Sequence, residues 1–518
     1  MSNDTPLSTA ARIFAFGTMC VGFFIALLDI QIVSSSLKEI GGGLSAGPDE
    51  TAWVQTSYLI AEIVVIPLSG WLSRVMSTRW LFSFSAIGFT VASMLCGMAW
   101  DIHSMIFFRA LQGFLGGSMI PTVFTTAFYF FQGNQRVIAA AVVGGLSSLA
   151  PTLGPTVGGW ITENYSWHWL FFVNLVPGIF VAIAVPLMVK IDKPDLSLLK
   201  RADYLGMALM AIFLATLEYT LEEGARWSWF SDDTIRLTAW ISGITGIAFI
   251  IRSLTHSDPV VDLRALKNRS FLIGCLLSFT IGIGIFATIY LTPVFLARVR
   301  GFNAEQIGLA VLTTGIAQVF SIPVYMFFAR RVDLRWLLLA GVLLFAASMW
   351  NFVPITHDWG WRELLVPQAL RGFAQQFAVA PTVTLTLGGL APHRLKLASG
   401  LFNLMRNLGG AIGIAACGTL LNDRTNLHFA RLAEHLNAGA AAEFIQRSGS
   451  SAGATFGDAV AGQGAALREL GSLVQREAFT MSFSDTFVLI CIGFVLAALL
   501  VPLLPRPAAM TAAPADAH

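Results

Sequence analysis

Charged residues are scarce in this chain. Asp, Glu, Lys and Arg make up 12% of its 518 residues, whereas a soluble domain carries about 25%. Their balance leaves a net charge of +2, which gives no indication of a charged partner, and we expect no nucleic-acid ligand. The five cysteines all fall in apolar segments, so the sequence contains neither a disulfide framework nor the spacing of a metal site.

Motifs of enzymatic catalysis are also missing from the sequence. We find no His/Cys metal cluster, no nucleophile elbow and no phosphate-binding loop. A membrane enzyme or a non-transporting receptor is therefore the weakest of our hypotheses. We predict a protein that is not an enzyme and that holds no cofactor.

What the chain contains instead is apolar sequence. Apolar side chains make up 55% of the residues and the mean hydropathy is +0.70, which is typical of a protein embedded in a lipid bilayer. Since a crossing needs roughly 20 apolar residues, we predict an all-α polytopic membrane protein with fourteen transmembrane helices. The predicted crossings are residues 13–37, 52–73, 80–100, 104–131, 137–162, 168–189, 204–221, 235–252, 270–297, 305–329, 335–355, 363–390, 397–421 and 482–504.

The distribution of basic residues predicts the topology. An even number of crossings places both termini on one side of the membrane. The short segments on that side carry most of the Lys and Arg residues, for example Lys193, Lys200 and Arg201 after crossing 6. The positive-inside rule therefore predicts that both termini are cytoplasmic.

Two short sequence matches indicate an internal repeat. Residues 109–114 read RALQGF and residues 368–373 read QALRGF, while the glycines and leucines of 145–158 recur at 400–413. These matches join crossing 4 to 12 and crossing 5 to 13, and chance similarity of glycine-rich apolar helices is the alternative explanation. Parallel repeats of this kind build alternating-access transporters, which hold the substrate near the midplane between the two halves.

A period of eight crossings in a chain of fourteen implies two helices inserted between two six-helix halves. We predict an N-terminal half at 1–200, two inserted transmembrane helices at 201–260 and a C-terminal half at 261–518. The C-terminal half includes a long periplasmic loop at about 422–480, rich in Ala, Gly and Ser at its middle, with a short amphipathic helix near 467–474. This loop either docks a partner protein or is simply solvated.

Charged side chains lie within several predicted crossings, where a charge costs several kcal/mol and marks a candidate functional site, and three of them are candidates for proton coupling. They are Asp29, Glu62 and Arg109. Burial favours the neutral form of a carboxylate and a nearby arginine favours its charged form, so a carboxylate between these influences can take up and release a proton. We predict proton coupling through all three, although Glu62 is equally well explained as a structural partner.

Further polar residues of the crossings are candidates for the substrate cavity or for gating. Arg109 and Gln112 are three residues apart and share a helix face, and Gln368 and Arg371 repeat the pair in exchanged order. Because a guanidinium does not deprotonate, it acts as a fixed charge or a multiple donor; the alternative is an architectural arginine that satisfies carbonyl groups. Gln31 and Arg406 complete the polar candidates.

Crossing 5 carries an unusual run of glycine and proline at 144–159, including Gly154, Pro155 and Gly158. Proline removes a helix hydrogen bond, and glycine loosens the backbone and lets a second helix approach closely. We predict a kinked helix that moves against its neighbours and add these three residues to the gating candidates. Ordinary tight helix packing is the alternative.

These motifs resemble those of the major facilitator superfamily, and within it the fourteen-spanner drug:proton antiporters of the EmrB/QacA type. Residues 28–33 are similar to the family's crossing-1 block L-D-x-T-I-V, and 109–113 fit its R-x-x-Q-G motif, whose arginine is implicated in proton transfer. Residues 154–159 resemble the second part of its crossing-5 antiporter motif. The segments 167–178 and 399–410 are similar to two further blocks of the family.

The sequence departs from the family pattern at several positions. Gln31 replaces the usual threonine, Ala150 the first glycine of the crossing-5 motif, and His168 an arginine. The loop after crossing 2 has Arg74 at its usual aspartate and Ser77 at its usual glycine. In the family that loop is thought to latch the two halves, so we expect that the usual Asp-centred latch cannot operate here.

The resemblance implies a multi-pass pump of the bacterial inner membrane that exports lipophilic small molecules, is driven by the proton gradient and works by alternating access. It also implies a periplasmic adaptor and an outer-membrane channel as partners, for which 422–480 is the candidate contact. The alternative is a proton-coupled carrier of one specific metabolite or lipid.

Overall fold

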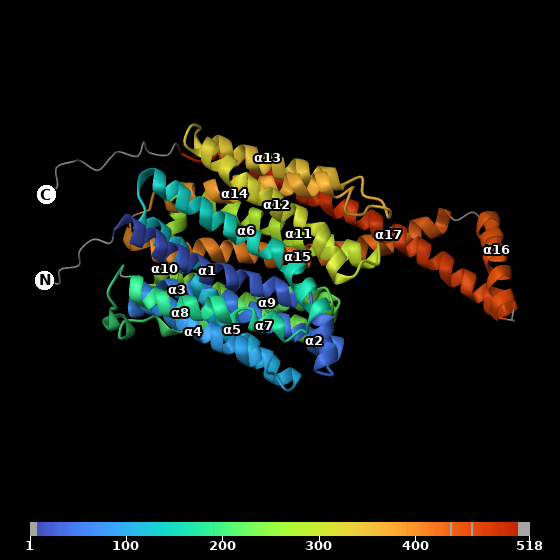
Figure 1. Cartoon of the computed structure of the whole chain (residues 1–518), viewed down its shortest axis with the longest axis horizontal. Helices are drawn as coiled ribbons and strands as arrows, with labels where there is room; N and C mark the ends of the chain where they lie inside the picture. Colours follow the sequence, from blue (N-terminus) through green and yellow to red (C-terminus); the bar gives the residue numbers. More distant parts are fainter. Residues whose placement is uncertain (1–7, 190, 391, 436–437, 457–458, 506–518) are drawn as a thin grey trace.

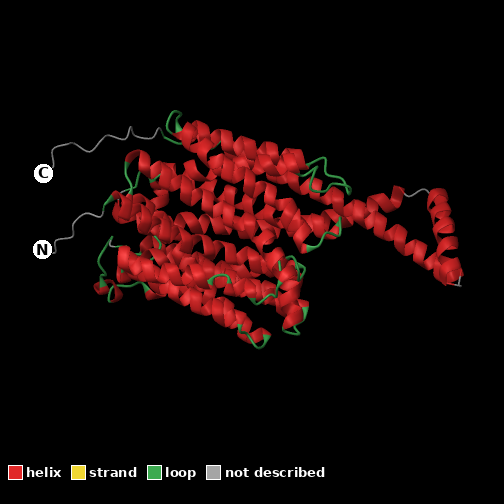
Figure 2. Ribbon diagram, in the orientation of Figure 1, coloured by secondary structure: helices red, strands yellow, loops and turns green. Residues whose placement is uncertain are grey.

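The computed structural model describes residues 8–505 except 190, 391, 436–437 and 457–458. Within that part the chain is helical and has no strand (Figure 2). The helices are α1 (Thr9–Ser34), α2 (Leu37–Gly43), α3 (Pro48–Met76), α4 (Thr78–Gly97), α5 (Ile102–Phe130), α6 (Gly133–Asn164), α7 (Trp169–Phe172), α8 (Leu175–Met188), α9 (Tyr204–Gly224), α10 (Asp233–Thr255), α11 (Arg269–Arg298), α12 (Ala304–Ala329), α13 (Leu334–Phe352), α14 (Leu365–Leu387), α15 (Pro392–His435), α16 (Ala438–Phe456) and α17 (Ala459–Ala498). Short 3-10 turns are η1 (Leu196–Leu199), η2 (Trp229–Ser231), η3 (Leu263–Lys267) and η4 (Val501–Leu503).

Each of the fourteen predicted crossings coincides with a helix, and crossing 6 combines α7 and α8. Among the described residues, twelve helices are long and apolar enough to span a membrane. The other two predicted crossings, α5 and α14, have 29 and 23 residues, more than the roughly 20 needed. They fall short in apolarity, since both carry buried polar side chains such as Arg109 and Arg371.

The helices form one bundle, in which α1 begins at one end and α16 lies beyond the other (Figure 1). We call these the terminal end and the far end. Helices α1, α3, α4, α5 and α8 pack mainly within a first group that includes α6, and α11, α13, α14, α15 and α17 pack mainly within a second group that includes α12. The two groups meet where α6 contacts α12 and α14, and where α15 contacts α3 and α5. The predicted boundaries at 200 and 260 stay a prediction.

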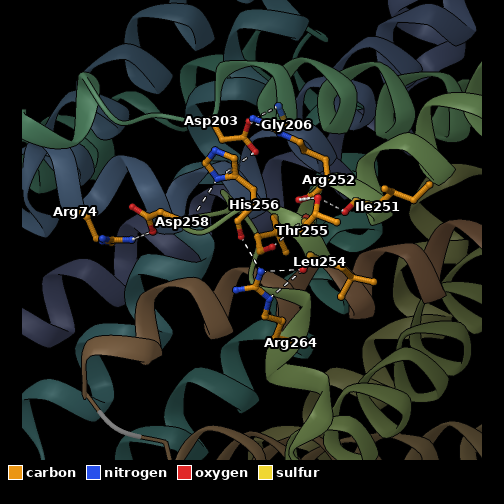
Figure 3. A network of polar contacts seen from close by, with 12 residues as sticks. Arg74, Asp203, Gly206, Ile251, Arg252, Leu254, Thr255, His256, Asp258 and Arg264 are labelled. Atoms are coloured by element: carbon orange, nitrogen blue, oxygen red, sulfur yellow. Dashed lines mark hydrogen bonds and ion pairs between the residues drawn. The ribbon is translucent and has the colours of Figure 1, made fainter.

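The inserted helices α9 and α10 pack on each other, and α9 also contacts α3 and α15. At the terminal end Asp203 caps α9 and accepts a hydrogen bond of 3.0 Å from Arg252 Nε of α10 (Figure 3). Beside it, Arg74 lies 3.6 Å from Asp258 in an ion pair between α3 and the segment after α10. Arg74, which stands at the family's aspartate position, therefore pairs with the segment that follows the inserted helices.

The segment 422–480 is not the loop that the sequence predicts. Helix α15 continues to His435, α16 spans Ala438–Phe456, and α17 starts at Ala459 and enters the bundle unbroken. Together they form a protrusion beyond the far end (Figure 1). The short helix predicted at 467–474 is part of α17, and residues 436–437 and 457–458 lie outside the described residues.

Candidate functional site

Asp29 is the centre of a buried polar cluster that joins α1, α5 and α8. Arg109 Nη1 lies 2.6 Å from Asp29 Oδ2 in an ion pair whose two side chains are fully buried. Gln112 Nε2 donates to Asp29 Oδ1 at 3.1 Å, and Asn174 Nδ2 donates to the same oxygen at 2.6 Å. Both carboxylate oxygens are thus hydrogen-bonded, which is what an ionised carboxylate in an apolar protein interior requires.

A second layer of contacts fixes the orientation of Arg109. Its Nε donates to the carbonyl of Val54 at 3.1 Å, and its guanidinium carbon lies 4.2 Å from the centre of the Tyr58 ring. Asn174 is held by Ser93, whose hydroxyl oxygen accepts a hydrogen bond of 3.0 Å. Removing one member of a buried ion pair costs about 3–5 kcal/mol because it leaves the other charge uncompensated.

The local sequence explains how α5 reaches this position. Asp101 caps the helix by accepting a hydrogen bond of 2.7 Å from the backbone of Ser104. One turn beyond Arg109, a Cβ on Gly113 would lie 2.3 Å from the Tyr58 carbonyl oxygen. Only glycine therefore lets α5 pack this closely on α3, and that approach brings Arg109 to the Val54 carbonyl.

A cavity of about 980 Å³ opens at the far end of the bundle, enclosed by helices that include α1, α3, α9, α11 and α15. This volume suits a drug-sized ligand. Gln31, Glu62 and Pro155 line the cavity, and Glu62 Oε1 has no hydrogen-bond partner among the described residues. Asp29 does not line the cavity, since its side chain points into the polar cluster.

The terminal end of the bundle is closed by contacts between α3 and α15. A Cβ on Gly70 would lie 2.7 Å from the Lys396 carbonyl oxygen. Lys396 Nζ donates to the carbonyl of Ser73 at 2.9 Å and forms an ion pair with Asp192. Asp192 also accepts hydrogen bonds of 3.0 Å from the backbone of Thr78 at the start of α4. A charge latch is thus present, but its carboxylate comes from the segment after α8.

We expect Lys396→Gln and Asp192→Asn to have non-additive effects on thermal stability, with a coupling of about 0.5–3 kcal/mol. Each substitution leaves the partner charge without its counter-charge, in a buried position for Lys396 and a half-buried one for Asp192. Thermal unfolding of both single variants and the double variant measures the coupling. The control cycle is Arg447→Gln with Glu443→Gln, an exposed pair within α16 for which little coupling is expected. Additive effects at Lys396 and Asp192 would contradict the latch.

The second member of the repeat is a polar cluster without a carboxylate. Arg371 Nη2 donates to Thr314 Oγ1 at 2.9 Å and to Gln368 Oε1 at 3.0 Å. Among the described residues no ion pair involves Arg371, and its Nε and Nη1 have no hydrogen-bond partner. The predicted pairing of arginine and glutamine on one face is therefore present in both halves, while an acidic partner is found only in the first.

The glycines of the crossing-5 run pack α6 on α1. A Cβ on Gly154 would lie 2.2 Å from Gln31 Cβ, and one on Gly158 would lie 2.7 Å from the Ile32 carbonyl oxygen. In the repeat, Gly409 and Gly413 meet the backbone of α11 in the same way. Helix α6 runs unbroken through Pro151 and Pro155.

The sequence profile of the Major Facilitator Superfamily matches residues 19–414 and 274–516. The chain belongs to this superfamily. It is 39% identical to the colistin resistance protein EmrB of Acinetobacter baumannii over 82% of this chain and 83% of that protein. The multidrug export protein EmrB of Escherichia coli K12 is 32% identical, with coverages of 84% and 85%. The fatty acid resistance protein FarB of Neisseria gonorrhoeae is 31% identical, with coverages of 87% and 90%.

Solved structures agree with this assignment of the fold. The proton:xylose symporter XylE, bound to 6-bromo-6-deoxy-D-glucose, superposes with a TM-score of 0.62 over 96% of this chain and 97% of that one, at 13% identity. The human organic anion transporter MFSD10 gives a TM-score of 0.55 over 93% and 99%, also at 13% identity. As a superfamily member with this fold, the chain is a multi-pass secondary transporter and not an enzyme.

The structure separates the predicted site residues into those that line the cavity and those that do not. Gln31, Glu62 and Pro155 line it. The other candidates for the cavity or for gating do not line it, so gating stays a prediction for them. They are Gln112 in the Asp29 cluster, Gln368 and Arg371 in the second cluster, Gly154 and Gly158 against α1, and Arg406 on α15.

Several residues at the site are missing from the sequence-based candidates. Asn174 lies in the family block at 167–178, which was the signal that could have identified it. Asp192 and Lys396 lie in connecting segments, from which we predict only the membrane topology. Glu218 and Glu222 of α9 line the cavity, although their helix belongs to the inserted pair.

Proposed function

We propose that this transporter exports lipophilic small molecules in exchange for protons by alternating access. Its relatives named for multidrug export and colistin resistance support export of drug-like compounds. The cavity is large enough for such compounds and is lined largely by apolar side chains, among them Leu27, Ile30 and Phe286. One end of the bundle is closed and the other open, as alternating access requires of either end state.

The observation that carries proton coupling is the fully buried Asp29–Arg109 pair. In this conformation the Asp29 carboxyl group is held by three donors and does not line the cavity. Protonation of Asp29 removes its attraction for Arg109, so the contacts between α1 and α5 have to rearrange. Glu62 lines the cavity and supplies a carboxylate that exchanges protons with cavity water.

Proton flux in proteoliposomes tests this proposal. When a proton gradient is directed into the vesicles, lipophilic compounds of unrelated structure are expected to move out of them, opposite to the protons. Their presence is also expected to increase the proton flux into the vesicles. A second candidate, a proton-coupled carrier of one metabolite or lipid, is favoured by the relative named for fatty acid resistance. Coupled flux with a single fatty acid and with none of several unrelated compounds would support that candidate instead.

We further infer that both termini are cytoplasmic, so that the cavity opens to the periplasm in this conformation. Serines at opposite ends test the orientation, since Ser450 of α16 and Ser197 of η1 are both exposed. In intact spheroplasts, a membrane-impermeant maleimide is expected to label Ser450→Cys and not Ser197→Cys. The native cysteines are buried or half-buried, and the cysteine-containing parent protein is the control. Labelling of Ser197→Cys alone would reverse the orientation.

With that orientation, the protrusion of α15, α16 and α17 reaches into the periplasm, where we propose that it contacts an adaptor protein linked to an outer-membrane channel. Replacing α16 with a short Gly-Ser linker is then expected to remove drug protection in cells while proteoliposome transport persists. Equal loss in both assays would instead make α16 part of the transport machinery, and loss in neither would leave the adaptor without this contact.

A further inference from the structure

Helix α9 of the inserted pair forms part of the cavity wall. It contacts α3 and α15, the two helices that close the terminal end of the bundle. It presents Glu218, Leu221 and Glu222 to the cavity. Glu218 and Glu222 are four residues apart and therefore share one helix face. An inserted helix thus places two carboxylates where a ligand would lie.

Neither carboxylate has a counter-ion of its own within the described part of the chain. Glu218 is 4% exposed, and its Oε2 has no hydrogen-bond partner. No ion pair of the described residues involves Glu222. The neighbouring Glu223 behaves differently, since it accepts a hydrogen bond of 3.1 Å from Thr56 and pairs with Arg226. A buried carboxylate without a partner is costly unless a proton or a bound cation compensates it.

The cations of the cavity lie at its mouth. Lys38, Arg226 and Arg298 line it and are exposed at the far end, and Arg226 is already paired with Asp49 and Glu223. Two other arginines lie near the inner carboxylates but do not line the cavity. They are Arg406, which faces Glu62 from α15, and Arg109, which is bound to Asp29. The inner cavity wall is therefore acidic, with Glu62 from α3 beside Glu218 and Glu222 from α9.

The remaining wall suits the apolar part of such a ligand. Helix α11 contributes Phe286, Ile289 and Tyr290, and α15 contributes Ile414. Aromatic rings attract organic cations through their faces, and the aliphatic side chains cover hydrocarbon. Acidic and aromatic groups in one cavity select for a molecule that combines a positive charge with a large apolar surface.

We propose that Glu218 and Glu222 bind the positive group of an amphipathic cation, so that the inserted helix α9 is a substrate-binding element of this transporter. The proposal rests on the proposed export function and names its substrate class. It also gives the inserted pair a role in recognition beyond connecting the halves. Glu62 lies close enough to sense the bound charge, and this links cation binding to the carboxylate that exchanges protons with the cavity.

The experiment compares two ligands of similar size, the cation tetraphenylphosphonium and the neutral triphenylphosphine oxide. Binding of each is measured on purified full-length protein as wild type, Glu218→Gln, Glu222→Gln and the double variant. Losing a charge-assisted contact is expected to weaken cation binding about tenfold to a hundredfold in the double variant, with binding of the neutral ligand unchanged. Asp233→Asn, an exposed carboxylate of the inserted pair that does not line the cavity, is the matched control and is expected to change neither.

Each other outcome overturns the proposal. Equal losses for both ligands would make the two carboxylates structural. Unchanged cation binding combined with lost proton flux for every substrate would make them a proton site. A separate measurement tests the proposed function. If wild-type protein moves neither ligand in proteoliposomes, the export function is wrong, whatever Glu218 and Glu222 bind.

Discussion

Replacing Asp29 with asparagine is expected to abolish proton-coupled export. Asparagine has nearly the same shape, but it takes up no proton and carries no charge, and its single oxygen accepts on only one of the two sides where Arg109 and Asn174 donate. The expected result in proteoliposomes is substrate-dependent proton flux at the background level, with the protein still folded and inserted. Proton flux and substrate efflux measured in the same vesicles test this. Wild-type rates from Asp29→Asn would contradict the role given to Asp29.

Stability has to be measured alongside, because this substitution leaves the Arg109 charge buried without its partner, a loss of about 3–5 kcal/mol. The double variant Asp29→Asn with Arg109→Gln removes both charges and is expected to recover much of that stability without recovering proton coupling. Asp233→Asn, an exposed carboxylate at the start of α10, is the control and is expected to leave flux unchanged. Proton coupling restored in the double variant would show that the single Asp29→Asn variant failed through misfolding.

The energetic cost of charge in a membrane identifies special residues in a sequence, but it does not identify their partners. Asp29 and Arg109 were predicted in this way, and they form one ion pair across 80 positions. Asn174 is not among the predicted residues, because no charged residue stands near it in the sequence and it gains its role only when the turn between α7 and α8 brings it to Asp29.

Helix boundaries limited the rest of the site prediction. The predicted crossing at 204–221 ends before Glu222, which would place that carboxylate at the membrane surface, yet α9 continues to Gly224. The sequence does not predict the ion pair of the latch, because Asp192 and Lys396 lie 204 positions apart and each resembles an ordinary charge of a connecting segment. The Ala-, Gly- and Ser-rich part of 422–480 is helical because α16 packs against α17, and such tertiary packing overrides the low helix propensity of glycine.

Gly154→Ala is expected to reduce both stability and transport, although replacing glycine with alanine inside a helix usually stabilises by about 0.5–1 kcal/mol. The added methyl group would lie 2.2 Å from Gln31 Cβ and 3.0 Å from the Gln31 backbone carbon. Since backbone is involved, α1 has to move away from α6. Its displacement shifts Gln31 in the cavity wall and disturbs Asp29 two residues earlier. We expect a lower thermal unfolding temperature and the loss of most transport activity in the folded, purified protein.

Gly17→Ala on α1 is the matched control, because nothing lies within 4 Å of a Cβ at that position, and it is expected to leave both readouts unchanged or to stabilise slightly. Gly409→Ala tests the repeat, since its Cβ would lie 2.1 Å from the Phe279 carbonyl oxygen of α11; we expect the same losses there. The two readouts separate packing from gating. If Gly154→Ala lowers only the unfolding temperature and its folded fraction transports normally, the glycine run is a packing device and the predicted gating role is wrong. Loss of transport per folded molecule would instead mean that the close seating of α6 on α1 is needed for the conformational cycle itself.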